Sequence, residues 1–137
     1  MHWEHFEHKA DIGVRGFGHT LGESFEQAAL ALTAVAADPA CIRAAETVEI
    51  ECRGSDPELL FVDWMNAIIF EASTRGMLFG RFEVDIAGDV LRGKLYGEAV
   101  DRTRHQPAAE AKGATYTELR VARQADGLWL AQCVIDV

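Results

Sequence analysis

Two segments with helical signals stand between short strand-like segments, and this order restricts the chain to an α+β architecture. The first segment, TLGESFEQAALALTAVAADP, spans residues 20–39. Thr20 is followed three residues later by Glu23, the pattern of a capping box at a helix N-terminus. Apolar residues then repeat at helical spacing up to Pro39, so we expect a helix that ends before this proline.

The second helical segment, SDPELLFVDWMNAIIFEASTRG, spans residues 55–76. Ser55 or Asp56 is suited to the N-cap, Pro57 to the first helical position and Gly76 to the C-terminal stop. Apolar residues cover most of the circumference of this helix. The pattern therefore predicts a buried central helix.

The remaining segments alternate as strands do. They are residues 2–8, 12–17, 47–53, 79–86, 90–98, 116–123 and 128–135. Short turn-like connections, AGD and QADG, predict hairpins and hence antiparallel pairing of the later strands. With 137 residues and 49% hydrophobic content, the chain suits one domain over residues 1–137. The expected fold is α+β, a single-domain sandwich of mostly antiparallel strands with two main helices.

Charge and composition restrict the partners. The chain has 13 Lys and Arg against 22 Asp and Glu, a net charge of -9, which repels a phosphate backbone, so we expect no direct nucleic-acid binding. No apolar run reaches the roughly 20 residues that span a bilayer, and the N-terminus lacks the pattern of a signal peptide. We expect a cytoplasmic protein without a membrane partner. Its three cysteines, without a C-x-x-C pair, are expected to be reduced thiols, mostly in the core.

Three familiar patterns do not support a site. The GVRGFG stretch, residues 13–18, lacks the spacing and the Lys-Ser/Thr ending of a phosphate-binding loop, so its glycines indicate strand bends and a tight turn. His2, His5 and His8 lie three apart, and a strand turns alternate residues to opposite faces, so they do not converge on a metal. No nucleophile elbow surrounds any serine.

Asp11 and the chain end suggest a cation site. The sequence ends in CVIDV, with Asp136 beside the free carboxylate of Val137. If the first and last strands are neighbours, these groups meet Asp11, and crowded carboxylates favour a hard cation such as Ca²⁺ or Mg²⁺. The alternative is that Asp11 caps a turn and Asp136 is solvated.

The long loop over residues 99–115 gathers basic groups in an acidic protein. Arg102, Arg104, His105 and Lys112 suit contact with an acidic surface or a phosphate on a partner. The alternative is that these are solvated loop charges.

These stretches together resemble the archease family, nearly end to end and in order. The segment WEHFEHKADIGVRGFG is similar to its N-terminal signature, GEAVDRTRHQPAAEAKGATYTEL to its Gly-Glu-x-x-Asp-x-x-x-His loop, and CVIDV to its C-terminus. The resemblance implies an archease-like sandwich and an accessory protein that activates an RtcB-type RNA ligase by promoting its guanylylation and multiple turnover. It also implies a metal site at Asp11, Asp136 and Val137, holding Ca²⁺, with Mg²⁺ and Mn²⁺ as alternatives.

The sequence departs from the family pattern at three positions. Lys9 replaces a usual Thr and places an ammonium near Asp11, Thr117 stands where His is frequent, and Gly113 replaces Ala. The resemblance to the archease family also implies that Lys112 contacts the partner.

Arg104 and His105 complete this partner-contact set. Two other readings stay open: a stand-alone metal-dependent hydrolase that uses Asp11 and Asp136 to activate water, and an interaction module whose carboxylates bind nothing.

Overall fold

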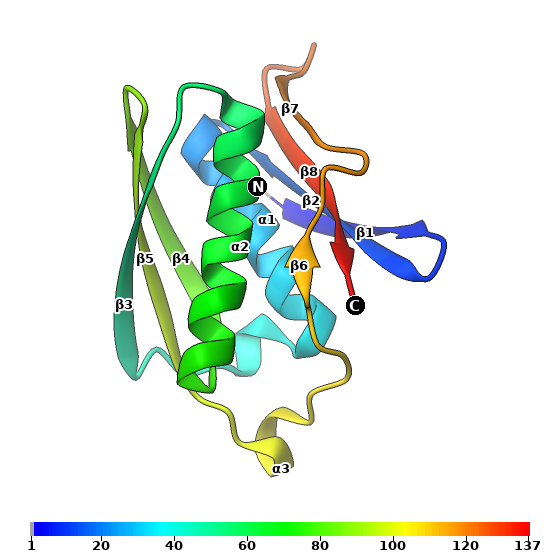
Figure 1. Ribbon diagram of the computed structural model, residues 1–137, viewed down its shortest axis with the longest axis vertical. Helices are drawn as coiled ribbons and strands as arrows, with labels where there is room; N and C mark the ends of the chain where they lie inside the picture. The colour runs from blue at the N-terminus through cyan, green and yellow to red at the C-terminus, as the bar shows by residue number, and fades with distance from the viewer. Residues whose placement is uncertain (1) are drawn as a thin grey trace.

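Residues 2–137, which the computed structural model describes, form two antiparallel sheets with the main helices between them (Figure 1). The strands are β1 (His2–His8), β2 (Asp11–Gly18), β3 (Glu46–Arg53), β4 (Met77–Ala87), β5 (Val90–Ala99), β6 (Gly113–Ala114), β7 (Arg120–Arg123) and β8 (Trp129–Asp136). The helices are α1 (Leu21–Ala36), α2 (Pro57–Arg75), α3 (Arg102–His105) and the 3₁₀ turn η1 (Pro39–Cys41). One sheet has the order β1-β2-β8-β6 with β7 also beside β8, and the other has the order β3-β5-β4. The predicted α+β sandwich is confirmed.

The N-terminus of α1 carries the predicted cap in a modified form. Thr20 is the N-cap, and its hydroxyl accepts a hydrogen bond from the backbone N–H of Glu23 over 3.1 Å. The Glu23 carboxylate reaches back to the N–H of His19 over 2.7 Å, one residue earlier than the N-cap of a standard capping box. The helix ends at Ala36, before Pro39, as the sequence predicts.

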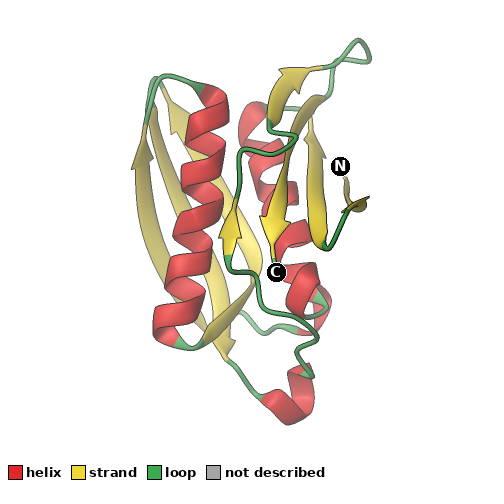
Figure 2. Ribbon diagram, turned by 45° about the vertical axis from the view of Figure 1, so that its right-hand side comes forward, coloured by secondary structure: helices red, strands yellow, loops and turns green. Residues whose placement is uncertain are grey.

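Helix α2 begins and ends as its sequence indicates, but it is not buried on all sides. Asp56 is its N-cap, and Gly76 ends it with a left-handed backbone at φ 63°. Leu59 is 49% exposed and Phe70 is 62% exposed, so two of the apolar residues expected in the interior face solvent and the predicted buried helix is buried on one side only. One side of the helix faces solvent, because the two sheets and α1 cover only the others (Figure 2).

The core lies where the helices pack on the two sheets. Gly16 of β2 allows close approach of α1, because a Cβ atom there would lie 2.2 Å from the backbone nitrogen of Ala28. The indole N–H of the buried Trp64 donates to the Phe25 carbonyl over 3.1 Å and ties α2 to α1. Residues 13–18 lie within strand β2 and do not form a phosphate loop, as predicted, but Gly16 serves close packing against α1 where strand bends and a tight turn were expected.

The segment after the long loop differs from the prediction. Only Arg120–Arg123 of the expected strand 116–123 is extended, because Glu118 adopts a left-handed backbone at φ 54°, which interrupts a strand. The loop itself contains α3 and the short strand β6, which pairs with β8.

Two of the three cysteines lie in the core as free thiols, as the sequence predicts. None of the described helices is long and apolar enough to cross a membrane. Cys52 and Cys133 are buried free thiols, and Cys41 is an exposed free thiol. Burial raises the pKa of the Cys133 thiol to about 12.

Candidate metal site at the joined chain ends

The strand pairing brings Asp11 to the C-terminus. Strands β2 and β8 are antiparallel, with Ile12 opposite Ile135, so the next pair in this register is Asp11 and Asp136. The backbone N–H of Val137 donates to the Asp11 carboxylate over 3.4 Å. Residues more than a hundred positions apart thus meet at one end of the sheet, where the C-terminus lies beside β6 (Figure 2).

The segment before β6 forms the other border of this site. The backbone N–H of Lys112 donates to the carbonyl of Asp136 over 2.8 Å, and Gly113 pairs with Asp136. Lys9 lies in the tight turn between β1 and β2 with a left-handed backbone at φ 54°. The structure therefore places Lys112 next to the predicted ligand residues, and Lys9 two residues before one of them.

The possible metal ligands at this edge are carboxylate oxygens of residues that differ in their exposure to solvent. Asp11 and Val137 are half-buried and Asp136 is exposed. Within residues 2–137, no three His, Cys, Asp or Glu side chains are grouped to hold a metal ion. A cation site at this edge therefore needs the main-chain carboxylate of Val137 as a third donor. Because carboxylates are hard ligands, the set fits Ca²⁺, Mg²⁺ or Mn²⁺.

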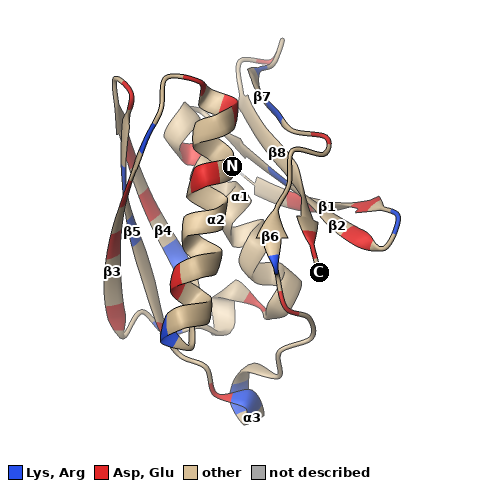
Figure 3. Cartoon of the chain, in the orientation of Figure 1, with Lys and Arg blue, Asp and Glu red and all other residues tan. Residues whose placement is uncertain are grey.

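Arg104 and His105 lie elsewhere, at the end of the molecule where α3 is found (Figure 3). The buried His105 accepts a hydrogen bond at Nδ1 from the Asp101 backbone N–H over 2.9 Å. Its Nε2 lies 3.0 Å from the Glu98 carboxylate. Because Nδ1 is an acceptor, Nε2 carries the hydrogen and donates a hydrogen bond to Glu98. Arg104 forms an ion pair with the same carboxylate and donates to the Cys41 carbonyl over 3.1 Å.

Glu98 is the residue that the sequence reasoning missed. It belongs to the Gly-Glu-x-x-Asp-x-x-x-His pattern, whose acidic residues and histidine form one hydrogen-bonded cluster, and this pattern was the available signal. The backbone N–H of Arg43 and the side chains of Arg104 and His105 lower the pKa of the Glu98 carboxyl to about 2. The partner-contact role expected for Arg104 and His105 stays a prediction.

The histidines of β1 do not converge. His5 Nε2 lies 2.7 Å from the Ala31 carbonyl on α1, whereas His2 stacks on the ring of Phe17 with centroids 4.4 Å apart. The two side chains serve different neighbours, as the strand spacing predicts.

Fold and site together define a class: a small two-sheet α+β protein whose second and last strands, β2 and β8, pair next to a group of carboxylates. The model of the Archease protein family (MTH1598/TM1083) matches residues 3–137. The chain is 41% identical over 139 residues to protein archease of Pyrococcus furiosus, covering 98% of both chains. It is 38% identical over 141 residues to protein archease of Methanopyrus kandleri, covering 100% of both. The chain belongs to the archease family.

Solved structures support the same fold. The solution structure of protein 1598 from Methanobacterium thermoautotrophicum matches with a TM-score of 0.87 and 32% identity, covering 98% of both chains. A crystal structure from Thermotoga maritima, described as "an archease, possible chaperone", matches with a TM-score of 0.65 and 24% identity, covering 96% of this chain and 94% of that one. The second likeness concerns the fold alone.

Proposed function

We propose that this protein is a non-enzymatic accessory factor that activates an RtcB-type RNA ligase in tRNA splicing or RNA repair, promoting guanylylation of the ligase and its multiple turnover. Membership of the archease family supports the proposal, and the observation that carries it is the contact between Asp11 and Val137. The net charge of -9 agrees with a protein that acts on a ligase and leaves RNA binding to it.

Asp11, Asp136 and the terminal carboxylate of Val137 hold the divalent cation in this proposal, with Ca²⁺ as the expected ion. A bound cation supplies positive charge that offsets the repulsion among these carboxylates and gives the site a coordination position for a partner group. The N–H of Val137 helps to orient the Asp11 carboxylate.

Lys112 is the contact residue proposed for the ligase. The Lys112 side chain is exposed, and its backbone N–H is hydrogen-bonded to the Asp136 carbonyl. The side chain therefore lies in solvent next to the proposed ligands Asp11, Asp136 and Val137. An activator must bind the activation-competent state of the ligase more tightly than other states, and a fixed acidic site with an adjacent ammonium provides the contacts for such a preference.

The first experiment measures guanylylation of the ligase from the same organism with labelled GTP. Substoichiometric wild-type protein is expected to accelerate labelling and to allow repeated turnover. Asp11→Asn is expected to lose this effect, whereas Asp85→Asn, an exposed carboxylate on β4, serves as the matched control and keeps it. No acceleration of a competent ligase would contradict the proposal, and phosphoester turnover by the protein alone would favour the hydrolase.

The second experiment tests the terminal carboxylate. One glycine added after Val137 moves that carboxylate away from Asp11 without changing any side chain. Thermal unfolding of wild-type protein is expected to shift upward with Ca²⁺, because an ion that binds only the folded state stabilises it. The extended protein is expected to lose most of this shift. An equal shift in both proteins would remove Val137 from the ligand set.

A further inference from the structure

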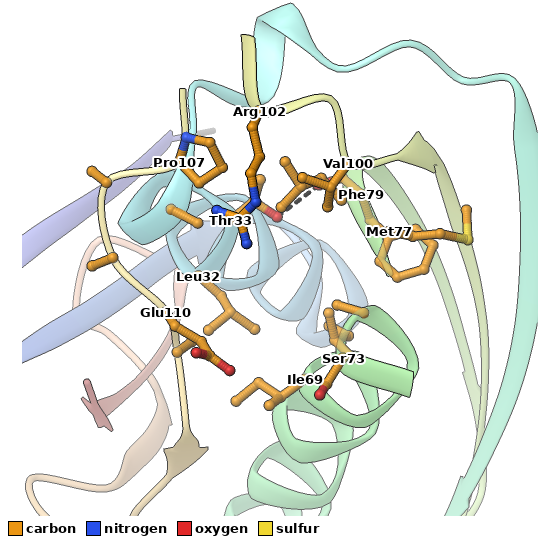
Figure 4. Close-up of a pocket in the computed structure, with 17 residues that line it drawn as sticks. Leu32, Thr33, Ile69, Ser73, Met77, Phe79, Val100, Arg102, Pro107 and Glu110 are labelled. Atoms are coloured by element: carbon orange, nitrogen blue, oxygen red, sulfur yellow. Dashed lines mark hydrogen bonds between the residues drawn. The ribbon is translucent and has the colours of Figure 1, made fainter. Parts of the chain in front are cut away.

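We propose that this protein has a second site, separate from the proposed metal site at Asp11, Asp136 and Val137. This second site binds a small amphiphile that has an apolar body and one anionic group. The site is a pocket of about 470 Å³ between α1, α2, β4 and the loop that follows β5 (Figure 4). This volume falls in the range typical of small-molecule sites. Leu32, Ile69, Met77, Phe79 and Val100 are among the apolar side chains that line it.

Residues 100–112, here called the strap, close one side of the pocket and are fixed in several places. At the start of the strap, the N–H of Val100 donates to the Gly76 carbonyl over 2.9 Å. In its middle, the N–H of Ala108 donates to the Ala36 carbonyl on α1 over 2.8 Å. The buried His105 ties α3 to Glu98 on β5. These contacts fix the strap to α1, to β5 and to Gly76 at the end of α2, so the side of the pocket that it forms is preformed.

The charged side chains at the pocket determine the class of ligand. Arg102 extends from the strap toward Thr33, and its guanidinium takes part in none of the ion pairs found among the described residues (Figure 4). The Arg102 guanidinium is therefore available to form an ion pair with an anionic group of a ligand in this pocket. The Thr33 hydroxyl donates its hydrogen to the Phe79 carbonyl over 2.7 Å.

Glu110 restricts the ligand to a single anionic group. It also lines the pocket, further along the strap than Arg102 and below it in the view of Figure 4. A ligand with a second anion at its other end would bring that anion toward this carboxylate, which is unfavourable. A neutral apolar ligand fills the pocket but leaves Arg102 without a partner. The expected order of affinity is monoanion, then neutral, then dianion.

The test compares three probes of equal chain length by ¹H–¹⁵N chemical-shift titration of the full chain. Octanoate is the monoanion, 1-octanol the neutral probe and suberate the dianion. Shifts are expected at the pocket residues of α1, α2 and the strap. Octanoate is expected to bind roughly two- to fivefold more tightly than 1-octanol, the gain typical of an ion pair open to solvent. Shifts confined to other surfaces, or none that saturate, would overturn the proposal.

Variants separate the charge from the cavity. Arg102→Gln is expected to remove the preference for octanoate over 1-octanol, whereas Arg120→Gln, an exposed arginine on β7, is the matched control and keeps it. Ala72→Leu on α2 and Ala36→Leu on α1 each fill part of the pocket and are expected to weaken the binding of all three probes. Two filling variants are used in case one does not fold. Unchanged binding in a folded filling variant would exclude this pocket as the site.

Discussion

Replacement of His105 by alanine decides between the structural role that its contacts indicate and the partner-contact role that the sequence suggested. The imidazole is buried, donates to Glu98 and accepts from the backbone N–H of Asp101. Alanine removes both hydrogen bonds and leaves the ring's volume empty. Glu98 keeps its contacts with Arg104 and with the N–H of Arg43, so no charge loses all its partners.

The expected cost follows from these contacts. Two hydrogen bonds contribute about 1 kcal/mol each, and burial of the ring contributes roughly another 1 kcal/mol. His105→Ala is therefore expected to lower the free energy of unfolding by about 3 kcal/mol, which for a chain of this size lowers the melting temperature by about 10 °C. His19→Ala is the control, because the His19 side chain is 69% exposed and its loss is expected to cost under about 0.5 kcal/mol.

The assay is urea unfolding followed by tryptophan fluorescence, paired with ligase guanylylation under conditions where both variants are folded. A structural role predicts lost stability with activation kept, once the protein is folded. Wild-type stability with lost activation would refute the reasoning and make His105 a contact for the ligase.

Two further predictions test the local physics. Because hydrogen bonds from Arg43 and Arg104 lower the pKa of Glu98 from 4.5 to about 2, this carboxylate contributes stability that is present above pH 4.5 and is lost as the pH falls through 2. Urea midpoints measured over this range are expected to fall more steeply for wild type than for Glu98→Gln, and parallel slopes would contradict this. Gly16→Ala is expected to lower the free energy of unfolding by about 3 kcal/mol, since its Cβ meets the backbone of α1, whereas Gly54→Ala has open space and is expected to be neutral in the same urea assay.

The helices were predictable because their signals are local. Thr20 and Asp56 act within one turn of the residues they cap, and Gly76 ends α2 through its own backbone freedom. The exposed side of α2 was not predictable in the same way. Leu59 and Phe70 are apolar, so periodicity alone assigned them to the core, whereas their exposure depends on where the sheets end.

The sites depended on contacts between distant segments, which sequence spacing does not report. The expected meeting of Asp11 with the C-terminus assumed that the first and last strands are neighbours, and this assumption was wrong, because the second strand, β2, separates β1 from β8. Asp11 still reaches the chain end because it begins β2, which pairs with β8. The hydrogen bond from His105 to Glu98 could not be predicted in the same way, because Glu98 lies on another element, β5. A turn at Glu118 was hidden because its left-handed backbone carries no strong residue signal.

The proposed metal site can form only after the whole chain has folded, because its donors come from both ends. Asp11 reaches Val137 through the pairing of β2 with β8, and Lys112, the residue before β6, lies on the other side of β8. In the unfolded chain the carboxylates of Asp136 and Val137 remain adjacent, but Asp11 is no longer near them. The unfolded chain therefore binds a cation through fewer ligands than the folded protein does. Cation binding is then linked to closure of this sheet, and the thermal shift with Ca²⁺ measures that linkage. Asp11→Asn should consequently reduce the shift even where it leaves the stability without Ca²⁺ unchanged or higher, because it also removes one repelling charge.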